Sequence, residues 1–355
     1  MYGYIINYLR FIYFVGPGCV WKGTRHLDRA KTRRVLVLGG TSFISSCVVR
    51  SLVAAGHEVT VLRRSQDSLL PSEVRHISGD RARLAEFVDV FRQARPDVIV
   101  DTIPYTQQHA KTLVEVARGL VGRLVVVSSV DVYRARDRIW RLDPGPPDPN
   151  PLTEDSPLRD RLFPYAQTRP EPGKDAFATT YDKILVEQMV TGEPDLESTV
   201  VRLPQVYGHG DYSHRTFEFL KRMDDGRPFI LLPEALANYR ASRGYVNDVA
   251  EAVALSAVSD KAAGRVYHVG DQDNLTETAW VTRIGRAAGW EGKVVLLPLE
   301  RLPLPLQNKY GYDARQDWSI DTSRIRHELG YSASTPSSVA MQRTVEWERT
   351  NPRQI

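Results

Sequence analysis

Glycines and small hydroxyl residues follow the first strongly apolar run of the chain. Residues 35–38 read VLVL, and a helical pattern begins after the turn formed by Gly39, Gly40, Thr41, Ser42, Phe43 and Ile44. A strand–turn–helix unit of this kind leaves backbone N–H groups pointing outward and sets the positive end of a helix against an anion. The dinucleotide fingerprint has three glycines, whereas Ser42 and Ser45 stand at its second and third places here. We predict that residues 39–44 bind the pyrophosphate of a dinucleotide; the alternative is a turn that needs glycine only to change direction.

Two arginines, Arg63 and Arg64, end the next β-branched run, residues 58–62. An NAD site usually carries an acidic residue about 20 residues after the glycine turn, where it bonds the ribose 2′-hydroxyl. Guanidinium groups instead suit a 2′-phosphate, through charge and bidentate geometry. The pair therefore favours NADP over NAD as the cofactor, and the alternative is two solvated arginines at a strand end.

Strand-like and helix-like segments alternate from residue 34 onward. Short apolar or β-branched runs occur at 35–38, 58–62, 74–77, 98–100, 124–127 and 199–203, and helical spacing occurs at 43–55, 82–94, 107–119 and 179–191. This alternation is typical of right-handed βαβ crossovers. We expect an α/β fold whose doubly wound, mostly parallel Rossmann-type sheet occupies residues 34–203, with an irregular, proline-rich insertion at 143–178. Residues 204–350 show shorter units, and we expect a smaller substrate-binding portion over the carboxyl ends of the strands.

The composition is that of a globular protein and limits the classes of function. Of the 355 residues, 42% are hydrophobic and 25% charged, which excludes disorder and fibrous sequence as the main architecture. The net charge of +4 comes from the first 34 residues, because the remainder holds 40 basic and 42 acidic side chains. We therefore expect no nucleic-acid partner for the folded part. The two cysteines, Cys19 and Cys47, cannot form a disulfide framework, and no Cys/His cluster suggests a metal site.

The first 33 residues differ from the rest. Residues 1–21 are aromatic and apolar but are interrupted by Arg10, Pro17 and two glycines, whereas a membrane-spanning helix needs about 20 apolar residues. We expect residues 1–33 to be a flexible leader outside the fold; a weak membrane or partner contact and a targeting signal are the alternatives. No later stretch is long and apolar enough to span a bilayer, so we expect no stable membrane insertion and a cytoplasmic location.

Several short motifs occur in an order that carries a family resemblance. They are GGTSFI (39–44), GD (79–80), VSSVDVY (127–133), RLPQVYG (202–208), YVNDVA (245–250), and DTSR with LGY (321–324 and 329–331). Together they resemble the extended or atypical short-chain dehydrogenase/reductases of the NAD-dependent epimerase/dehydratase family, over about residues 34–348. The resemblance implies an NAD(P)-dependent enzyme that oxidises, transiently or permanently, a carbinol carbon of a sugar or nucleotide-sugar-like substrate.

The resemblance also assigns catalytic roles. It makes Ser129 the serine that bonds the substrate oxygen, and Lys183, four residues before Glu187, the lysine that bonds the nicotinamide ribose. The family places its catalytic tyrosine four residues before the lysine, but Tyr181 stands only two residues before Lys183. Two residues rotate a helical side chain by about 200°, so the two would not share a face. Either the helix begins at about Tyr181, which can then point inward and act as the base, or the ordinary base is missing; we favour the first.

The remaining assignments are also implied by the resemblance. Asp80 would lie near the adenine, the Pro204–Gln205 backbone beside the nicotinamide, and Tyr207 and Arg243 against the substrate. Enzymes of this type are often homodimers formed through two packed helices. Two other functions stay open: an NADP-dependent reductase with free cofactor turnover, and a non-catalytic dinucleotide-sensing or RNA-associated relative.

Overall fold

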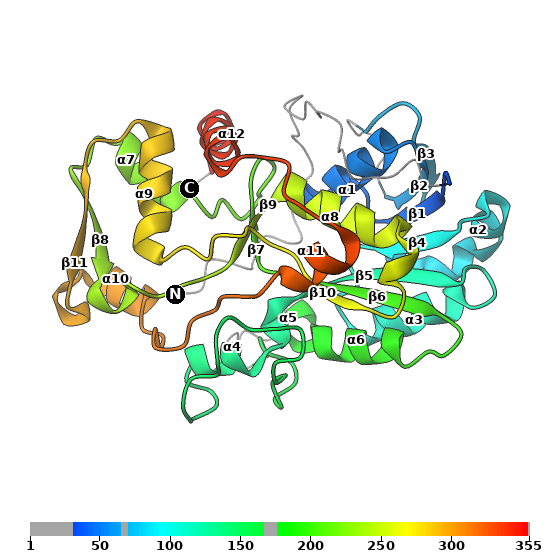
Figure 1. Cartoon of the computed structure of the whole chain (residues 1–355), viewed down its shortest axis with the longest axis horizontal. Helices are drawn as coiled ribbons and strands as arrows, with labels where there is room; N and C mark the ends of the chain where they lie inside the picture. Colours follow the sequence, from blue (N-terminus) through cyan, green and yellow to red (C-terminus); the bar gives the residue numbers. More distant parts are fainter. Residues whose placement is uncertain (1–30, 65–69, 167–175, 354–355) are drawn as a thin grey trace.

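A parallel sheet of seven strands forms the centre of the computed structural model, which describes residues 31–64, 70–166 and 176–353 (Figure 1). The strand order is β10-β6-β5-β4-β1-β2-β3. The bounds are β1 (Arg34–Leu38), β2 (Glu58–Arg63), β3 (Arg75–Ser78), β4 (Val98–Asp101), β5 (Arg123–Ser129), β6 (Glu197–Leu203) and β10 (Val266–His268). The side chains of β4 are buried on both faces, as in parallel sheets covered by helices. The prediction of a doubly wound Rossmann-type sheet is confirmed.

Helices cover both faces of this sheet. On one face α1 (Phe43–Ala54) packs against α8 (Val246–Val258), and on the other α3 (Gln107–Ala117) packs against α6 (Lys183–Thr191), as Figure 1 shows. A 3-10 segment, η2 (Arg81–Phe87), and α2 (Val88–Ala94) continue the face that holds α3. Shorter helical pieces are η3 (Val130–Val132), α4 (Arg134–Ile139), η4 (Glu234–Leu236), η5 (Asp260–Ala262) and η6 (Leu299–Arg301).

The helix expected at 179–191 is interrupted. A short helix, α5 (Ala176–Thr180), ends before Tyr181, and α6 begins only at Lys183. Asp182 caps α6, because its carboxylate accepts a hydrogen bond from the backbone N–H of Ile184 at 2.9 Å. Tyr181 thus lies outside both helices, so the helical rotation that would separate it from Lys183 does not apply.

The smaller portion packs beside the large sheet. It contains α7 (Phe217–Asp224), α9 (Glu277–Ala288), α10 (Leu304–Lys309), α12 (Ser337–Thr350) and two parallel strand pairs, β8 (Phe229–Pro233) with β11 (Lys293–Leu297) and β7 (Gln205–Tyr207) with β9 (Arg243–Tyr245). Two elements beyond residue 203, α8 and β10, belong instead to the large layer, where α11 (Ser323–Leu329) packs on β10. The chain therefore returns to the large sheet after it has begun the smaller portion.

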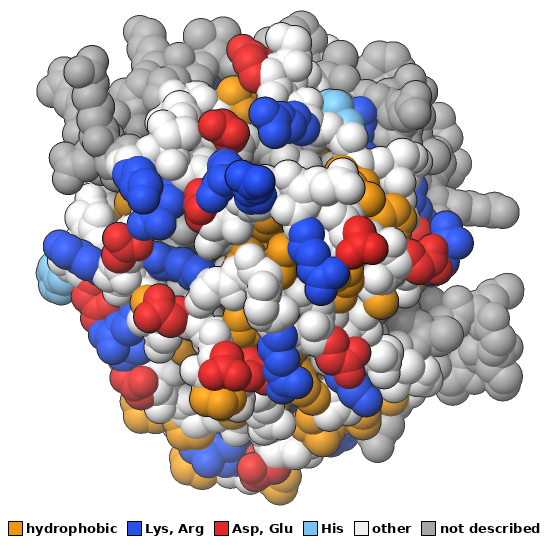
Figure 2. Space-filling model, turned by 90° about the vertical axis from the view of Figure 1, so that its right-hand side faces the viewer, with side chains coloured by type: hydrophobic (Ala, Val, Ile, Leu, Met, Phe, Trp, Pro, Cys, Tyr) orange, Lys and Arg blue, Asp and Glu red, His pale blue; other side chains and the backbone are white. Residues whose placement is uncertain are grey.

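The surface in Figure 2 carries basic and acidic side chains intermixed, with apolar side chains between them, and that face has no wide patch of one sign. In the described ranges no helix has the length and apolar character needed to cross a membrane. The expected leader falls almost entirely on residues 1–30, which lie outside the described residues.

Candidate active site at the strand ends

The carboxyl ends of four neighbouring strands define the site. The pairing places Leu62 of β2, Leu38 of β1, Asp101 of β4 and Val126 of β5 in one row across the sheet. The strand order reverses between β1 and β4, and such a switch point is where open α/β sheets bind ligands. The segments that leave these strands carry most of the predicted site residues.

The glycine turn follows β1 and packs tightly on its neighbours. Gly39 and Gly40 have positive φ angles of 108° and 39°, a region that side chains disfavour. A Cβ on Gly40 would lie 2.2 Å from Cγ1 of Val61, and one on Gly39 would lie 2.9 Å from Oγ1 of Thr102. Glycine is required at both positions, because the turn folds directly onto β2 and the residue after β4.

The amino end of α1 fits a phosphate group. Ser42 is the N-cap residue and is exposed, whereas the hydroxyl of buried Ser45 accepts a hydrogen bond from the Ser42 N–H at 3.0 Å. The first turn of α1 contains no acidic residue, and the first N–H groups of a helix have no partner within it. Thr41 and Ile44 are partly exposed, while the Phe43 ring is buried edge-on against Tyr212. The N–H groups of Gly39, Thr41 and Ser42 bond within the protein, so an anion would be held by the N–H groups of the first turn of α1 and by the Ser42 hydroxyl, which also lies 3.0 Å from the Ser45 hydroxyl.

The end of β2 presents two different arginines. Arg63, its last residue, is buried, while Arg64 is exposed. Burial lowers the pKa of His76 on the adjacent strand, and the positive charge of Arg63 lowers it further. Asp80, after β3, caps η2 by accepting a hydrogen bond from the Ala82 N–H at 2.9 Å. The sequence reasoning missed the next residue, Arg81, which forms a buried ion pair with Asp101 at the end of β4.

The two serines that end β5 have different partners. Ser128 is buried and donates a hydrogen bond to Oε1 of Glu187 at 2.5 Å. Ser129 is partly exposed, and its hydroxyl accepts a hydrogen bond from the Asp131 N–H at 3.2 Å. Only Ser129 thus keeps its hydroxyl proton available for a substrate oxygen.

Lys183 lies under the ends of β4 and β5. Its ammonium group donates hydrogen bonds to the carbonyl oxygens of Val127 at 2.8 Å and Pro104 at 3.0 Å. Burial lowers the pKa of Lys183 to about 8, although nearby carboxylates, Asp101 first among them, favour its charged form. The Lys183 ammonium therefore lies between β5, the strand that ends at Ser129, and the switch point, where the strand order reverses between β1 and β4.

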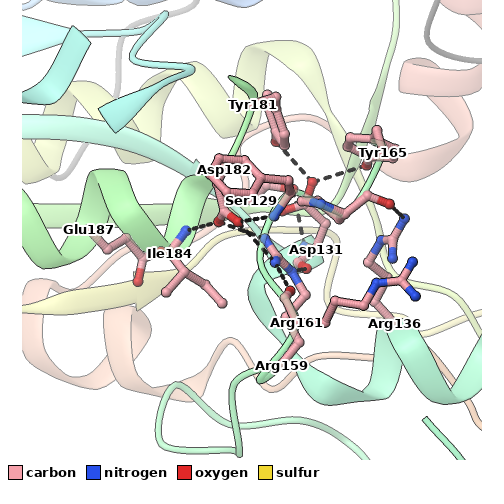
Figure 3. A network of polar contacts seen from close by, with 12 residues as sticks. Ser129, Asp131, Arg136, Arg159, Arg161, Tyr165, Tyr181, Asp182, Ile184 and Glu187 are labelled. Carbon is pink, nitrogen blue, oxygen red and sulfur yellow. Dashed lines mark hydrogen bonds and ion pairs between the residues drawn. The ribbon is translucent and has the colours of Figure 1, made fainter. Parts of the chain in front are cut away.

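Tyr181 enters the site beside two other aromatic rings. Its ring centroid lies 5.3 Å from that of Tyr165 and 6.2 Å from that of Tyr105. Its hydroxyl donates a hydrogen bond to Oδ2 of Asp131 at 2.9 Å (Figure 3). Asp131 follows Ser129 by two residues, so the structure brings Tyr181 and the end of β5 to one place.

The residues around this tyrosine include several that the sequence reasoning missed. The Tyr165 hydroxyl also donates to Oδ2 of Asp131, at 3.1 Å, and Arg159 forms a fully buried ion pair with Asp182, 2.8 Å apart (Figure 3). Asp131 lies inside the VSSVDVY motif, which was a usable signal. Tyr165 and Arg159 lie in the irregular insertion, where no periodicity indicates which side chains turn inward.

A second buried polar network connects α6 to the interior. Glu187 forms an ion pair with Arg202 of β6, and Arg202 donates to the Tyr133 hydroxyl at 2.6 Å. Nε2 of His268 accepts from that hydroxyl, because its Nδ1–H donates to the Asp321 carbonyl at 2.9 Å. Burial lowers the pKa of His268 to about 3. Glu187 of the K-x-x-x-E pattern thus holds α6 against the sheet.

The predicted substrate side lies on β7 and β9. Pro204 and Gln205 follow β6 directly, at the same edge of the sheet as Ser129, which pairs with Leu203. Tyr207 is buried, and its ring centroid lies 4.9 Å from that of Trp280. Arg243 is buried too, within 2.5 Å of the Glu277 carboxylate and 4.3 Å above the Trp280 ring. These contacts hold both side chains inside the smaller portion, against α9.

Comparison with known proteins gives the family of this fold and site. The family model described as the NAD dependent epimerase/dehydratase family matches residues 35–270. The chain is 27% identical to 2′-dehydrokanamycin reductase of Streptomyces kanamyceticus, covering 76% of this chain and 70% of that protein. It is 26% identical to dTDP-glucose 4,6-dehydratase of Streptomyces niveus, covering 90% and 93% respectively.

A solved structure agrees at the level of the fold. UDP-glucose 4-epimerase of Thermotoga maritima, determined with UDP-glucose, superimposes with a TM-score of 0.64 at 18% identity, covering 90% of this chain and all of that one. The family model extends over the glycine turn, β5, α6 and β10, which are the elements that form the site. The chain belongs to the NAD dependent epimerase/dehydratase family.

Proposed function

We propose that this protein is an NAD(P)-dependent enzyme that oxidises a carbinol carbon of a sugar-nucleotide-like substrate, as the first step of an epimerisation or dehydration. The observation that carries the proposal is the convergence of the glycine turn, Ser129 and Lys183 on adjacent strand ends. A dinucleotide laid across those ends would reach from the amino end of α1 to Lys183.

Each residue then has a physical role. Residues 39–44 would hold the diphosphate through backbone N–H groups, Asp80 would lie near the adenine, and Lys183 would bond the nicotinamide ribose. The Pro204–Gln205 backbone would border the nicotinamide, which when bound supplies the acceptor or donor of hydride. Ser129 and Tyr181 would bond the substrate hydroxyl and move its proton, and Tyr207 and Arg243 would form the substrate-side wall.

We also propose a preference for NADP over NAD. Arg64 is exposed, so its charge carries no desolvation cost and its guanidinium could contact a 2′-phosphate. Arg63 is buried and adds positive charge at the same strand end. Among the described residues, the end of β2 and the following Arg64 carry no carboxylate at the place where an NAD site usually has one. A homodimer formed through the adjacent helices α3 and α6, and a cytoplasmic location, complete the proposal.

A reductase that exchanges its cofactor at every turnover is the second candidate. The similarity to 2′-dehydrokanamycin reductase favours it, and the same residues would serve the reverse direction of the reaction. The two candidates differ in the fate of the cofactor. An epimerase or dehydratase regenerates its oxidised cofactor in the site, whereas a reductase releases the oxidised cofactor after each turnover.

The test begins with the cofactor. Isothermal titration of the purified chain with NAD⁺, NADP⁺ and their reduced forms should show binding, and a denatured sample analysed by mass should reveal any cofactor that copurifies. Incubation with UDP-glucose and dTDP-glucose as trial substrates, followed by chromatography of the sugars, then separates internal from external redox turnover. Absence of binding by all four cofactor forms, with none copurified, would overturn the proposal.

A further inference from the structure

The Asp131 carboxylate is an unusual group in this site. Its side chain is buried, and one oxygen, Oδ2, receives hydrogen bonds from both the Tyr181 and the Tyr165 hydroxyl (Figure 3). Its other oxygen, Oδ1, is buried without a hydrogen-bond partner among the described residues. A buried carboxylate with an unused oxygen has spare capacity to accept a proton.

The contrast with Asp182 sharpens this point. Asp182 is equally buried, but Arg159 neutralises it at 2.8 Å and two backbone N–H groups, those of Ile184 and Phe163, occupy its oxygens. Arg159 reaches Asp131 only at its backbone carbonyl oxygen, 2.9 Å from Nε. Asp182 is therefore committed to capping α6, whereas the Asp131 carboxylate is held by phenols that can exchange protons with it.

The Tyr181 hydroxyl and the Lys183 ammonium have different hydrogen-bond partners. The hydroxyl donates to Asp131, while the Lys183 ammonium donates to two backbone carbonyls and lies 5.0 Å from the centre of the Tyr105 ring. A phenol that donates a hydrogen bond to a carboxylate carries its own proton. Before it can take a proton from a substrate, it must pass that proton on.

We propose that Asp131 is the proton acceptor behind Tyr181, so that the two residues act as a relay in place of a tyrosine activated by an adjacent lysine. As the substrate O–H bond breaks, its proton goes to the Tyr181 oxygen, and the proton of Tyr181 goes to Oδ2 of Asp131. The substrate C–H bond breaks with its electron pair, which leaves as hydride for the oxidised nicotinamide dinucleotide. The carbinol becomes a carbonyl, the tyrosine is unchanged, and Asp131 ends as a carboxylic acid. The inference rests on the proposed function.

The groups around Asp131 support this role. Tyr165 holds the same carboxylate oxygen from the irregular insertion, and the guanidinium of Arg136 lies 5.0 Å from the centre of the Tyr165 ring. Lys183 and Arg159 interact with the Asp131 charge through space, since that charge favours the protonated form of each. Tyr165 thus fixes the orientation of the carboxylate, and two cations lie within electrostatic reach of it.

The first arm of the test needs no substrate. Tyrosinate absorbance is titrated for the full chain and for Tyr181→Phe, and their difference isolates the ionisation of Tyr181; the same pair is then measured with Asp131→Asn. Loss of a carboxylate in contact with the hydroxyl should move the ionisation of Tyr181 to lower pH by about one unit or more. An unchanged titration would show that the contact has no consequence in solution and would overturn the relay.

The second arm uses turnover of UDP-glucose or dTDP-glucose with the preferred cofactor. Asp131→Asn keeps the shape but not the proton affinity, and it should lower kcat about a hundredfold or more while KM changes little. It should also remove the decline of rate at acidic pH that protonation of a base produces. Tyr165→Phe, the matched control, removes the second hydrogen bond to the same oxygen and leaves the Asp131 carboxylate in place, so it should retain the acidic limb with at most a few-fold loss.

The outcomes separate the relay from the proposed function. Equal losses in Asp131→Asn and Tyr165→Phe, with the same pH profile, would indicate a structural role for Asp131 and overturn the relay alone. Failure of the unmodified chain to bind either cofactor would overturn the proposed function and the relay with it. If the chain binds cofactor but neither sugar is turned over, the titration alone decides the relay.

Discussion

Tyr181 and Lys183 lie on opposite sides of a helix start, and their polar groups go to different partners. The Tyr181 hydroxyl donates to the Asp131 carboxylate at 2.9 Å, whereas the Lys183 ammonium donates to the carbonyls of Val127 and Pro104. Asp182 stands between them as the helix cap. The break between α5 and α6 is what allows a tyrosine two residues before the lysine to reach Asp131, beyond the end of β5.

Replacement of Gly40 by alanine should prevent the glycine turn from closing. The new Cβ would lie 2.2 Å from Cγ1 of Val61, at a φ of 39°. Overpacking adds about 1–3 kcal/mol to the cost of a left-handed side chain, which is about 1–2 kcal/mol. We expect Gly40→Ala to lower the Tm more than the control Gly56→Ala, where φ is 85° and no atom lies within 4 Å of the new Cβ. Equal shifts in the two melting curves would contradict the packing argument, and Gly40→Ala with Val61→Ala should recover part of the loss.

Replacement of Arg64 by alanine should change the choice of cofactor. A charge-assisted hydrogen bond to a 2′-phosphate contributes about 1.5–3 kcal/mol, so NADP⁺ should bind at least about tenfold more weakly while NAD⁺ affinity stays the same. Isothermal titration measures both. Arg92→Ala, an exposed arginine on α2, is the control and should alter neither affinity. Parallel losses for both cofactors, or none, would place the 2′-phosphate elsewhere.

Because of Lys183, the free energy of unfolding should vary with pH in the alkaline range. Its pKa is lowered to about 8 in the fold from the ordinary value of 10.5, so between these values the unfolded chain binds more protons than the folded one. Stability therefore rises with pH across this window as far as this group is concerned. The free energy of unfolding of the unmodified chain minus that of Lys183→Met should increase from pH 8 to 10.5 in denaturant titrations.

The exposed helical lysine of α3 provides the control, since Lys111→Met should leave the difference flat. Lys183→Met should also weaken cofactor binding about tenfold near neutral pH, because a ribose hydroxyl loses a charged donor. A flat difference for Lys183→Met would mean that the ammonium is better solvated than its position under β4 and β5 indicates.

His268 should contribute to acid sensitivity. Burial lowers its pKa to about 3 from 6.5, so between these pH values the unfolded chain binds a proton on this histidine and the folded chain does not. The contribution is present in full above pH 6.5 and is lost as the pH falls toward 3. In His268→Gln the loss of stability over this range should be smaller than in the unmodified chain. His327→Gln, at an exposed position, should reproduce the unmodified acid curve; superimposable curves for all three proteins would contradict the assignment.

The sequence was sufficient for the sheet and for the glycine turn. The strands of the large sheet are short runs with little ambiguity of period, and the βαβ order leaves few topologies. The glycines at 39 and 40 meet a requirement of the backbone itself, so their place in the turn follows from residue type alone. The motif order also gave the family, because each motif marks a strand end.

The contacts of the insertion could not be predicted in the same way. Arg159 and Tyr165 lie in a segment without periodicity, and their partners, Asp182 and Asp131, are 23 and 34 residues away. The pairing of Arg81 with Asp101 was hidden for a related reason, since Arg81 follows β3 and Asp101 ends β4, and β1 and β2 lie between these two strands in the sheet. Side-chain partners across such separations follow from the assembled fold and not from local spacing.

The late return of the chain to the large sheet has a consequence for how this protein can be divided. A fragment that stops at residue 203 would lack β10, so the backbone N–H and C=O groups along one edge of β6 would be unpaired. Tyr133 would also lose His268 as its hydrogen-bond acceptor. Such a piece would present an unpaired strand to other molecules and would aggregate rather than bind cofactor by itself. The large sheet is therefore not a detachable module. Its last strand, β10, is synthesised only after β7, α7, β8 and β9 of the smaller portion.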